Sequence, residues 1–174
     1  GVYLRDVCKV FKNNGVCEET LFPYVTANFR NRPTVAMDEN AAKYKITGYY
    51  RVNSLQEYKE ALSDGHPVLL GMDVYESMET AEVARTGILP MPVNGEELLG
   101  GHAVLGMGYK DKAKQGLMMK FINKLTGRKP DGDYLMILNS WGREWGQEGY
   151  FFMTYDYFKK HVSDAWVLIL EEVK

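Results

Sequence analysis

Cysteine, net charge and long apolar runs are all scarce in this chain of 174 residues. Its two cysteines, Cys8 and Cys17, are too few for a disulfide framework, so we expect free thiols and a slight preference for a reducing, intracellular compartment. The formal net charge of −2 excludes a general affinity for nucleic acid or for acidic membranes. No apolar run reaches transmembrane length and no signal-peptide pattern opens the chain, so we expect no membrane span.

The composition that remains is that of an ordinary globular protein, 45% hydrophobic and 25% charged. The length suits one domain with a sizeable core. The first residue is glycine rather than methionine, so we expect the chain to be a processed or truncated product.

Apolar spacing predicts a helix over residues 4–13, with Cys8 on its buried face and Gly15 ending it. Ser54 to Glu57 has the pattern of a capping box, which predicts a helix that runs to about Ser63. Further patterns predict strands over 44–52, 68–75, 149–154 and 165–171, helical turns near 38–42 and 156–160, and either helix or ordered loop over 76–85.

Two other apolar runs each carry one polar residue suited to catalysis. The run GGHAVLGMGY, residues 100–109, predicts a buried strand with His102 at its entrance. The run DYLMILNSWG, residues 133–142, predicts a second strand that ends at Asn139 and continues into Trp141. A lone histidine beside an apolar strand is more often structural than catalytic. Two Trp-Gly pairs follow the asparagine and precede a Gly-Tyr-Phe strand, and that combination seldom arises by chance.

GHAVLGMGY and LNSWGREWGQEGYF resemble the histidine and asparagine segments of the papain-like family of cysteine peptidases. The resemblance implies that His102 is the base that takes a thiol proton and that Asn139 orients its ring. It also implies that Trp141, as a large buried aromatic, covers the bond between them from water.

The opening block GVYLRDVCKVFKNNGVCEETLFPY resembles the same family, at the segment that forms one wall of the substrate site. The resemblance implies that Gly1, Val2 and Tyr3 bind an extended peptide or protein substrate there. Gly101 and Ala103 would bind it on the side of the histidine. Tyr3 is larger than the residue expected at its position, which leaves the pocket preference open. The resemblance implies no metal and no cofactor.

The family's nucleophile signature, Cys-Gly-Ser/Ala-Cys-Trp/Tyr, does not occur in the chain. The family spacing would put it roughly 30–50 residues before Gly1. Cys8 belongs to the apolar face of its helix, and Cys17 precedes two acids that disfavour a thiolate. We therefore expect the nucleophile upstream or on another chain.

The fold class that the resemblance implies is α+β. A partial helical half, residues 1–43, would accompany an antiparallel β-barrel-like half, residues 44–174. Residues 110–132 form an insertion with the pattern of a basic amphipathic helix. That helix could bind a partner or a membrane surface, or it could pack locally with its basic face in solvent, which is the interpretation we favour.

The implied function is peptide-bond hydrolysis through an acyl-thioester, with His102 and Asn139 supplied by this chain. The alternative is a catalytically inactive relative that serves in binding or assembly. In either case an N-terminal fragment, a second copy or another chain is expected to complete the helical half, because its apolar face would otherwise be exposed.

Overall fold

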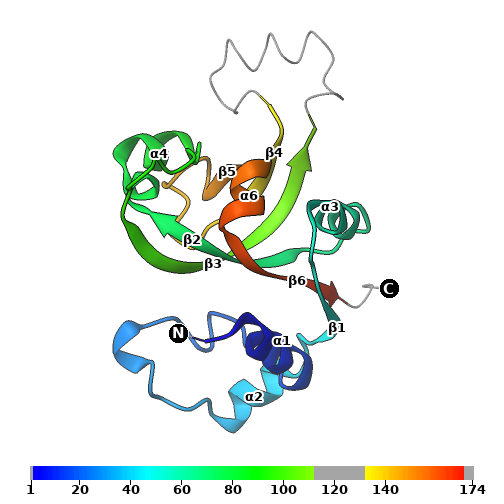
Figure 1. The fold of residues 1–174 in the computed structure, drawn as a ribbon. Coiled ribbons are helices and arrows are strands. Elements are labelled where there is room, and N and C mark those ends of the chain that lie inside the picture. The colour runs from blue at the N-terminus through cyan, green and yellow to red at the C-terminus, as the bar shows by residue number, and fades with distance from the viewer. Residues whose placement is uncertain (1, 112–131, 171–174) are drawn as a thin grey trace. The chain divides into compact units, whose positions relative to one another are not determined.

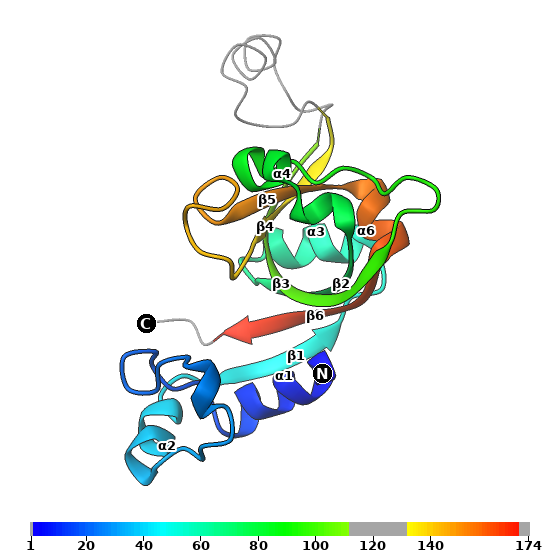
Figure 2. The same ribbon diagram turned by 90° about the vertical axis from the view of Figure 1, so that its left-hand side faces the viewer.

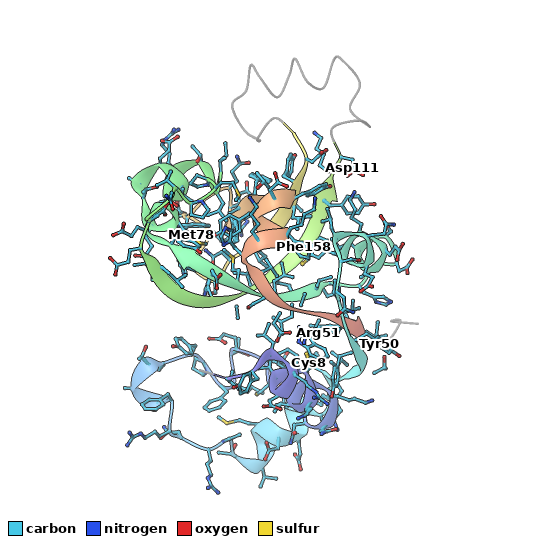
Figure 3. The ribbon with its side chains drawn as sticks, viewed as in Figure 1. Cys8, Tyr50, Arg51, Met78, Asp111 and Phe158 are labelled. Atoms are coloured by element: carbon cyan, nitrogen blue, oxygen red, sulfur yellow. The ribbon has the colours of Figure 1, made fainter. Side chains whose placement is uncertain are left out.

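A computed structural model describes residues 2–111 and 132–170. The chain separates into two compact units, Gly1–Tyr50 with Leu168–Lys174, and Arg51–Val167. Tyr50 and Arg51, which are labelled in Figure 3, stand on either side of that division. The predicted boundary between residues 43 and 44 stays a prediction about the family's two halves. The basic helix predicted within 110–132 lies mostly outside the described residues.

The first unit begins with helix α1, Leu4–Asn13, which has the bounds predicted from apolar spacing. Cys8 is fully buried on this helix, as predicted. The helix ends because Gly15 adopts a φ of 92°, a conformation that other residues rarely take. A side chain at Gly15 would also collide with the carbonyl group of Ala41. Both the backbone conformation and the lack of space therefore require glycine at this turn.

The rest of the first unit is held by a small polar cluster around Glu18. Its carboxylate accepts hydrogen bonds from Asn40 Nδ2 at 2.8 Å and from the Tyr44 hydroxyl at 2.9 Å. Asn40 Oδ1 in turn accepts the backbone N–H of Glu18 at 2.9 Å. These bonds connect the turn after α1 to α2, Val35–Ala41, and to the approach to β1, Ile46–Arg51. The unit also contains the short 3-10 helix η1, Thr26–Asn28.

The second unit is built on an antiparallel sheet in the strand order β6-β2-β3-β4-β5. Figure 2 shows β2, β3 and β6 running side by side. In the first unit β1 lies beside the end of β6, where Thr47 Oγ1 donates to the carbonyl oxygen of Ile169 at 3.1 Å. The strands not yet given bounds are β2, Val68–Tyr75; β3, Leu98–Lys110; β4, Tyr134–Leu138; β5, Tyr150–Thr154; and β6, Val162–Leu170.

Separate helices accompany this sheet, which gives the α+β class that the sequence predicts (Figure 1). They are α3, Leu55–Ser63; the 3-10 helix η2, Glu76–Glu79; α4, Ala81–Thr86; and α6, Tyr155–His161. Their side chains join those of the strands in one core, which includes Met78 and Phe158 (Figure 3).

Several predicted details were wrong at the ends of elements. The turn expected at 38–42 is a helix that starts earlier, because Thr34 Oγ1 accepts the backbone N–H of Met37 at 3.4 Å. The capping box at Ser54 is only half formed, since Glu57 accepts the backbone N–H of Asn53 instead of that of Ser54. β6 begins at Val162 rather than at residue 165. Over residues 76–85, where the sequence allowed either helix or ordered loop, η2 and α4 confirm the helical alternative.

Candidate active site

His102 lies in the fifth position of β3, directly across from Met72 of β2. The prediction that it stands at the entrance of a buried strand was wrong in both respects. β3 starts at Leu98, and its first residues are exposed because β4 does not reach them. Burial begins at Val104, just after the histidine. His102 is therefore a half-buried residue at the margin of the core.

Asn139 follows the last residue of β4 and is 8% exposed. Its Oδ1 lies 2.8 Å from His102 Nε2 and also accepts the backbone N–H of Ser140 at 2.9 Å. Its own backbone N–H donates to Gly149 at 2.9 Å, which fixes the residue at the start of the following loop. The structure thus brings together the two polar residues that the sequence singled out.

The hydrogen-bond pattern determines which tautomer a neutral His102 ring adopts. Oδ1 of Asn139 is an acceptor, so a neutral His102 ring donates from Nε2–H and keeps its lone pair on Nδ1. If the side-chain amide of Asn139 were flipped, its Nδ2 would face the backbone N–H of Ser140. Two hydrogen-bond donors would then face each other. The arrangement therefore holds Nδ1 as the nitrogen that can accept a proton.

Trp141 stacks on His102, with ring centroids 5.3 Å apart and an interplanar angle of 29°. Its indole is itself 38% exposed, so the expectation of a large buried aromatic was wrong. The indole thus stacks on the imidazole and remains partly in solvent. The covering role over the His102–Asn139 bond stays a prediction.

Trp145 supports Trp141 from the side, a contact that the sequence interpretation did not assign. The two rings meet edge to face at 4.9 Å, and Trp145 meets Phe151 of β5 in the same way at 5.9 Å. The signal was present in the second Trp-Gly pair, four residues after the first. This row of aromatic rings connects His102 to the core of the sheet.

The loop that carries both tryptophans is fastened to α4. The backbone N–H of Gly146 donates to Ala84 at 2.6 Å, and Gln147 Nε2 donates to the carbonyl oxygen of Thr86 at 3.1 Å. Gly146 has a φ of 63°, which permits this close approach. These two hydrogen bonds hold the loop that carries Trp141 against α4.

The residues predicted to bind substrate are distributed over both units. Gly101 and Ala103 flank His102 on β3 and are exposed. Val2 and Tyr3 belong to the first unit and are 68% and 81% exposed. Gly1 lies outside the described residues. The binding role of all five stays a prediction.

Both thiols lie in the first unit, and neither forms a disulfide. Cys8 is fully buried within α1, whereas Cys17 is partly exposed in the segment after it. Within residues 2–111 and 132–170, no group of three or more histidine, cysteine or acidic residues is placed to hold a metal ion. No helix in the same ranges is both long and apolar enough to cross a bilayer.

Comparisons with known proteins agree with this geometry. A peptidase C1-like protein of Acanthamoeba polyphaga mimivirus, described as uncharacterized, is 30% identical over 97% of this chain and 51% of its own length. Chymopapain of Carica papaya is 30% identical over 86% of this chain and 36% of its own length. The chain therefore spans about half, or less, of the length of these relatives.

Among solved structures, xylellain, a cysteine protease of Xylella fastidiosa, superposes with a TM-score of 0.76 at 29% identity, over 99% of this chain and 63% of that one. Procathepsin L 3 of Tenebrio molitor shares the fold, with a TM-score of 0.68 at 20% identity, over 98% of this chain and 49% of that one. The family model of papain family cysteine proteases matches residues 1–166. This chain belongs to the papain family of cysteine proteases.

Proposed function

We propose that this chain supplies the general-base side of a cysteine peptidase active site that hydrolyses peptide bonds through an acyl-thioester. The observation that carries the proposal is the 2.8 Å contact between His102 Nε2 and Asn139 Oδ1, which leaves Nδ1 as the basic nitrogen. Trp141 supports it further, because a ring stacked on the imidazole lowers the local dielectric and strengthens that bond.

In the proposed reaction, His102 Nδ1 takes the proton of a cysteine thiol, and the thiolate sulfur attacks the carbonyl carbon of the scissile bond. Nδ1–H then gives its proton to the amide nitrogen as the C–N bond breaks, which releases the amine and leaves the acyl-thioester. In the second half, Nδ1 takes a proton from water while the water oxygen attacks the thioester carbonyl. The C–S bond breaks, and the proton returns to sulfur.

The thiol for this reaction is proposed to come from outside residues 1–174 or from another chain. Cys8 is fully buried in the middle of a helix, where a substrate carbonyl has no access. Cys17 lies after a helix end rather than at a helix start, where a thiolate would be stabilised. These two observations also favour the alternative, a noncatalytic binding protein.

A partner that completes the helical half is part of the same proposal. The first unit has a groove of about 360 Å³ with a mostly apolar lining. Val10 of α1 lines this groove and is 51% exposed. An apolar segment from an N-terminal fragment, a second copy or another chain would bury this surface. The groove is lined chiefly by Val10, Phe11, Val16, Phe22, Met37 and Ala41.

The test is to assay the 174-residue chain with a fluorogenic peptide, alone and after refolding with a separate segment that carries a papain-family cysteine helix. We expect no turnover and no labelling by a cysteine-directed epoxide for the chain alone. Turnover should appear when the segment is added. Stoichiometric labelling of the chain alone that disappears in Cys17→Ser would contradict the external thiol. Peptide binding without turnover in any combination would favour the binding protein.

A further inference from the structure

β3 contains a β-bulge between His102 and its far end. Gly106 and Gly108 pair with two consecutive residues of β4, so Met107 between them has no partner in that strand. One residue of β3 is extra at this point, as in any bulge. On its other side, β3 pairs with β2 without interruption from Gly106 to His102. The irregularity therefore concerns the pairing of β3 with β4 alone.

The bulge determines which residue of β3 lies opposite Asn139. Leu105 pairs with Leu138, the last residue of β4, and Asn139 follows directly. Continued by one residue, this register places Asn139 opposite Val104. Without the extra residue, the register that the two strands have beyond Met107 would place Asn139 opposite Leu105 instead.

That difference of one residue decides whether Asn139 can reach His102. Side chains alternate between the two faces of a strand, so Val104 and His102 share one face while Leu105 belongs to the other. A slip by one residue would turn Asn139 to the face of Leu105. The contact of 2.8 Å between His102 Nε2 and Asn139 Oδ1 therefore depends on the bulge.

Tyr58 of α3 packs directly on Gly106, at the start of the bulge. A Cβ at Gly106 would lie 2.7 Å from Cε2 and 2.8 Å from Cζ of Tyr58, and it would also collide with the hydroxyl oxygen. Gly106 is not among the glycines with positive φ, so its backbone conformation does not require glycine. The ring of Tyr58 is what excludes a side chain there.

Tyr58 is itself fully buried, and its ring lies against Phe158 of α6 with centroids 5.3 Å apart. Its hydroxyl has no hydrogen-bond partner within residues 2–111 and 132–170. An unpaired buried hydroxyl costs free energy, so polar contacts do not explain why this position holds a tyrosine. The fit of the ring to the space above Gly106 does explain it.

We propose that Tyr58 and Gly106 are positioning residues for the pair of His102 and Asn139. The ring of Tyr58, seated on Gly106, holds β3 at the bulge, and the bulge sets the register that brings Asn139 to the face of His102. Tyr58 is buried, so it acts through β3 and not on a substrate. The consequence for catalysis rests on the proposed function.

The test adds one methyl group at Gly106 and then removes the ring that the methyl group meets. Gly106→Ala should displace β3 at the bulge, whereas the double variant, Gly106→Ala with Tyr58→Leu, lacks the colliding ring atoms and should restore the register. The readout is the tautomer of His102, followed by the imidazole nitrogen NMR signals of the folded 174-residue chain and assigned with His102→Ala.

In the parent chain the neutral ring of His102 should carry its proton on Nε2, because Asn139 Oδ1 accepts it. Gly106→Ala should lose this preference, and the double variant should regain it. If Gly106→Ala does not fold, the double variant decides, since it must fold with the proton on Nε2. An unchanged tautomer in folded Gly106→Ala, or a double variant without the Nε2 proton, would overturn the inference.

Two controls separate positioning from general stability. Gly108 flanks the same bulge, but a Cβ there would meet only the side chain of Met136, closest at Cε, 3.2 Å away, which is its flexible end. Gly108→Ala should therefore keep the proton on Nε2. Tyr58→Phe retains the ring atoms that meet Gly106, so it should also keep the tautomer, without a lower melting temperature. Loss of the tautomer in either control would contradict the role given to the ring.

The effect on catalysis is measured in the reconstituted protein. Gly106→Ala should lower kcat roughly tenfold, as expected for the loss of about one hydrogen bond that orients the base, and should change KM by less than about twofold. The double variant should recover most of that loss.

The two proposals fail separately. The expected tautomers without turnover in the reconstituted parent protein would keep the positioning role and reject the peptidase. Turnover in the parent protein, with the same tautomer and the same kcat in Gly106→Ala, would leave the peptidase intact and reject the positioning role.

Discussion

The two units of this chain differ in how well they bury their own apolar side chains. Among the largest fully buried side chains of the described residues, Cys8 alone comes from the first unit. The second unit buries aromatic, aliphatic and sulfur-containing side chains along β2, β4 and β5. The first unit leaves many of its large apolar residues exposed, among them Val2, Tyr3, Val10, Tyr24, Phe29 and Val35.

This difference shows which unit can bury an apolar core without help from another segment. The second unit holds His102, Asn139 and the row of aromatic rings on a sheet with its own core. The first unit depends on a polar cluster around Glu18 and on one glycine turn. Exposed apolar surface on that scale is typical of a face that another segment covers.

The largest expected effect concerns the site on the self-sufficient unit. In a reconstituted active protein, His102→Ala should lower kcat by about 10²–10⁴-fold, because it removes the general base. Asn139→Ala should lower kcat less, since Asn139 only orients the ring through its 2.8 Å bond. Steady-state kinetics on the same preparation measures both. Equal activity of His102→Ala and the parent protein would reject the assignment of the base.

The next effect tests whether the first unit folds separately. Gly15→Ala combines a φ of 92° with a collision against Ala41, so it should destabilise that unit by roughly 3 kcal/mol or more. Gly65→Ala is the control, because Gly65 has a φ of 84° but nothing within 4 Å, and it should cost about 1 kcal/mol.

Calorimetry together with the imidazole NMR signals of His102 separates the outcomes. If the units are independent, Gly15→Ala melts the first unit and leaves the His102 signals unchanged. A single shifted transition, with the loss of those signals, would show that the second unit is not self-sufficient.

A smaller effect concerns an ion pair at the end of β3, where Figure 3 labels Asp111. Lys59 Nζ lies 2.6 Å from Asp111 Oδ1, and both side chains are mostly buried. The Tyr155 hydroxyl donates to the same carboxylate at 2.7 Å. Burial, together with this bond to Asp111, raises the pKa of Tyr155.

Lys59→Ala should therefore destabilise the second unit by about 2 kcal/mol, because the carboxylate loses its cation in a poorly solvated place. Lys159→Ala is the control, since its pair with Asp156 is 3.9 Å long and exposed, and it should cost less than about 0.5 kcal/mol. Urea denaturation of both variants measures the contrast. Similar losses in the two would mean that the ion pair at Asp111 is no stronger than a surface pair.

The sequence predicted the helices and strands whose bounds are determined by a regular apolar pattern. The bounds of α1 and β2 follow from apolar periodicity. The pairing of His102 with Asn139 was expected from the resemblance of two segments to the papain family. Exposure was predicted less well. The open edge at Leu98 depends on where β4 begins, and the 38% exposure of Trp141 depends on how a loop meets α4.

Local hydrogen bonds explain the remaining errors. The early start of α2 comes from one bond between Thr34 and Met37. Glu57 accepts from Asn53 rather than from Ser54, although the pattern of a capping box was present. Such choices between neighbouring partners differ by about 1 kcal/mol, which periodicity does not resolve.

The smallest expected effect concerns acid. As the pH falls, we expect the first unit to lose protection from amide exchange before the second unit does. Hydrogen bonds from Asn40 and then Tyr44 lower the pKa of Glu18 below its ordinary value of 4.5. Hydrogen bonding by Ser77, first through its side chain, and by the backbone N–H of Val93 likewise lowers the pKa of Glu96 in the second unit. A depressed carboxyl pKa stabilises the fold above the unfolded pKa, and that contribution is lost as the pH falls through the folded value.

Both contributions are therefore present at neutral pH, and each is lost as the pH falls below the ordinary pKa of 4.5 and through the lowered folded value. Glu18 joins three segments of a unit that has little buried apolar surface, whereas Glu96 only holds the loop before β3 against a large core. Amide exchange measured from pH 6 to pH 3, corrected for intrinsic rates, should show Tyr44 losing protection at a higher pH than Ile137. Glu18→Gln should remove the pH dependence at Tyr44, because the amide does not titrate, and leave Ile137 unchanged. Loss of protection at the same pH at both positions would mean that the two units unfold together. The two units would then differ only in how much apolar surface they expose.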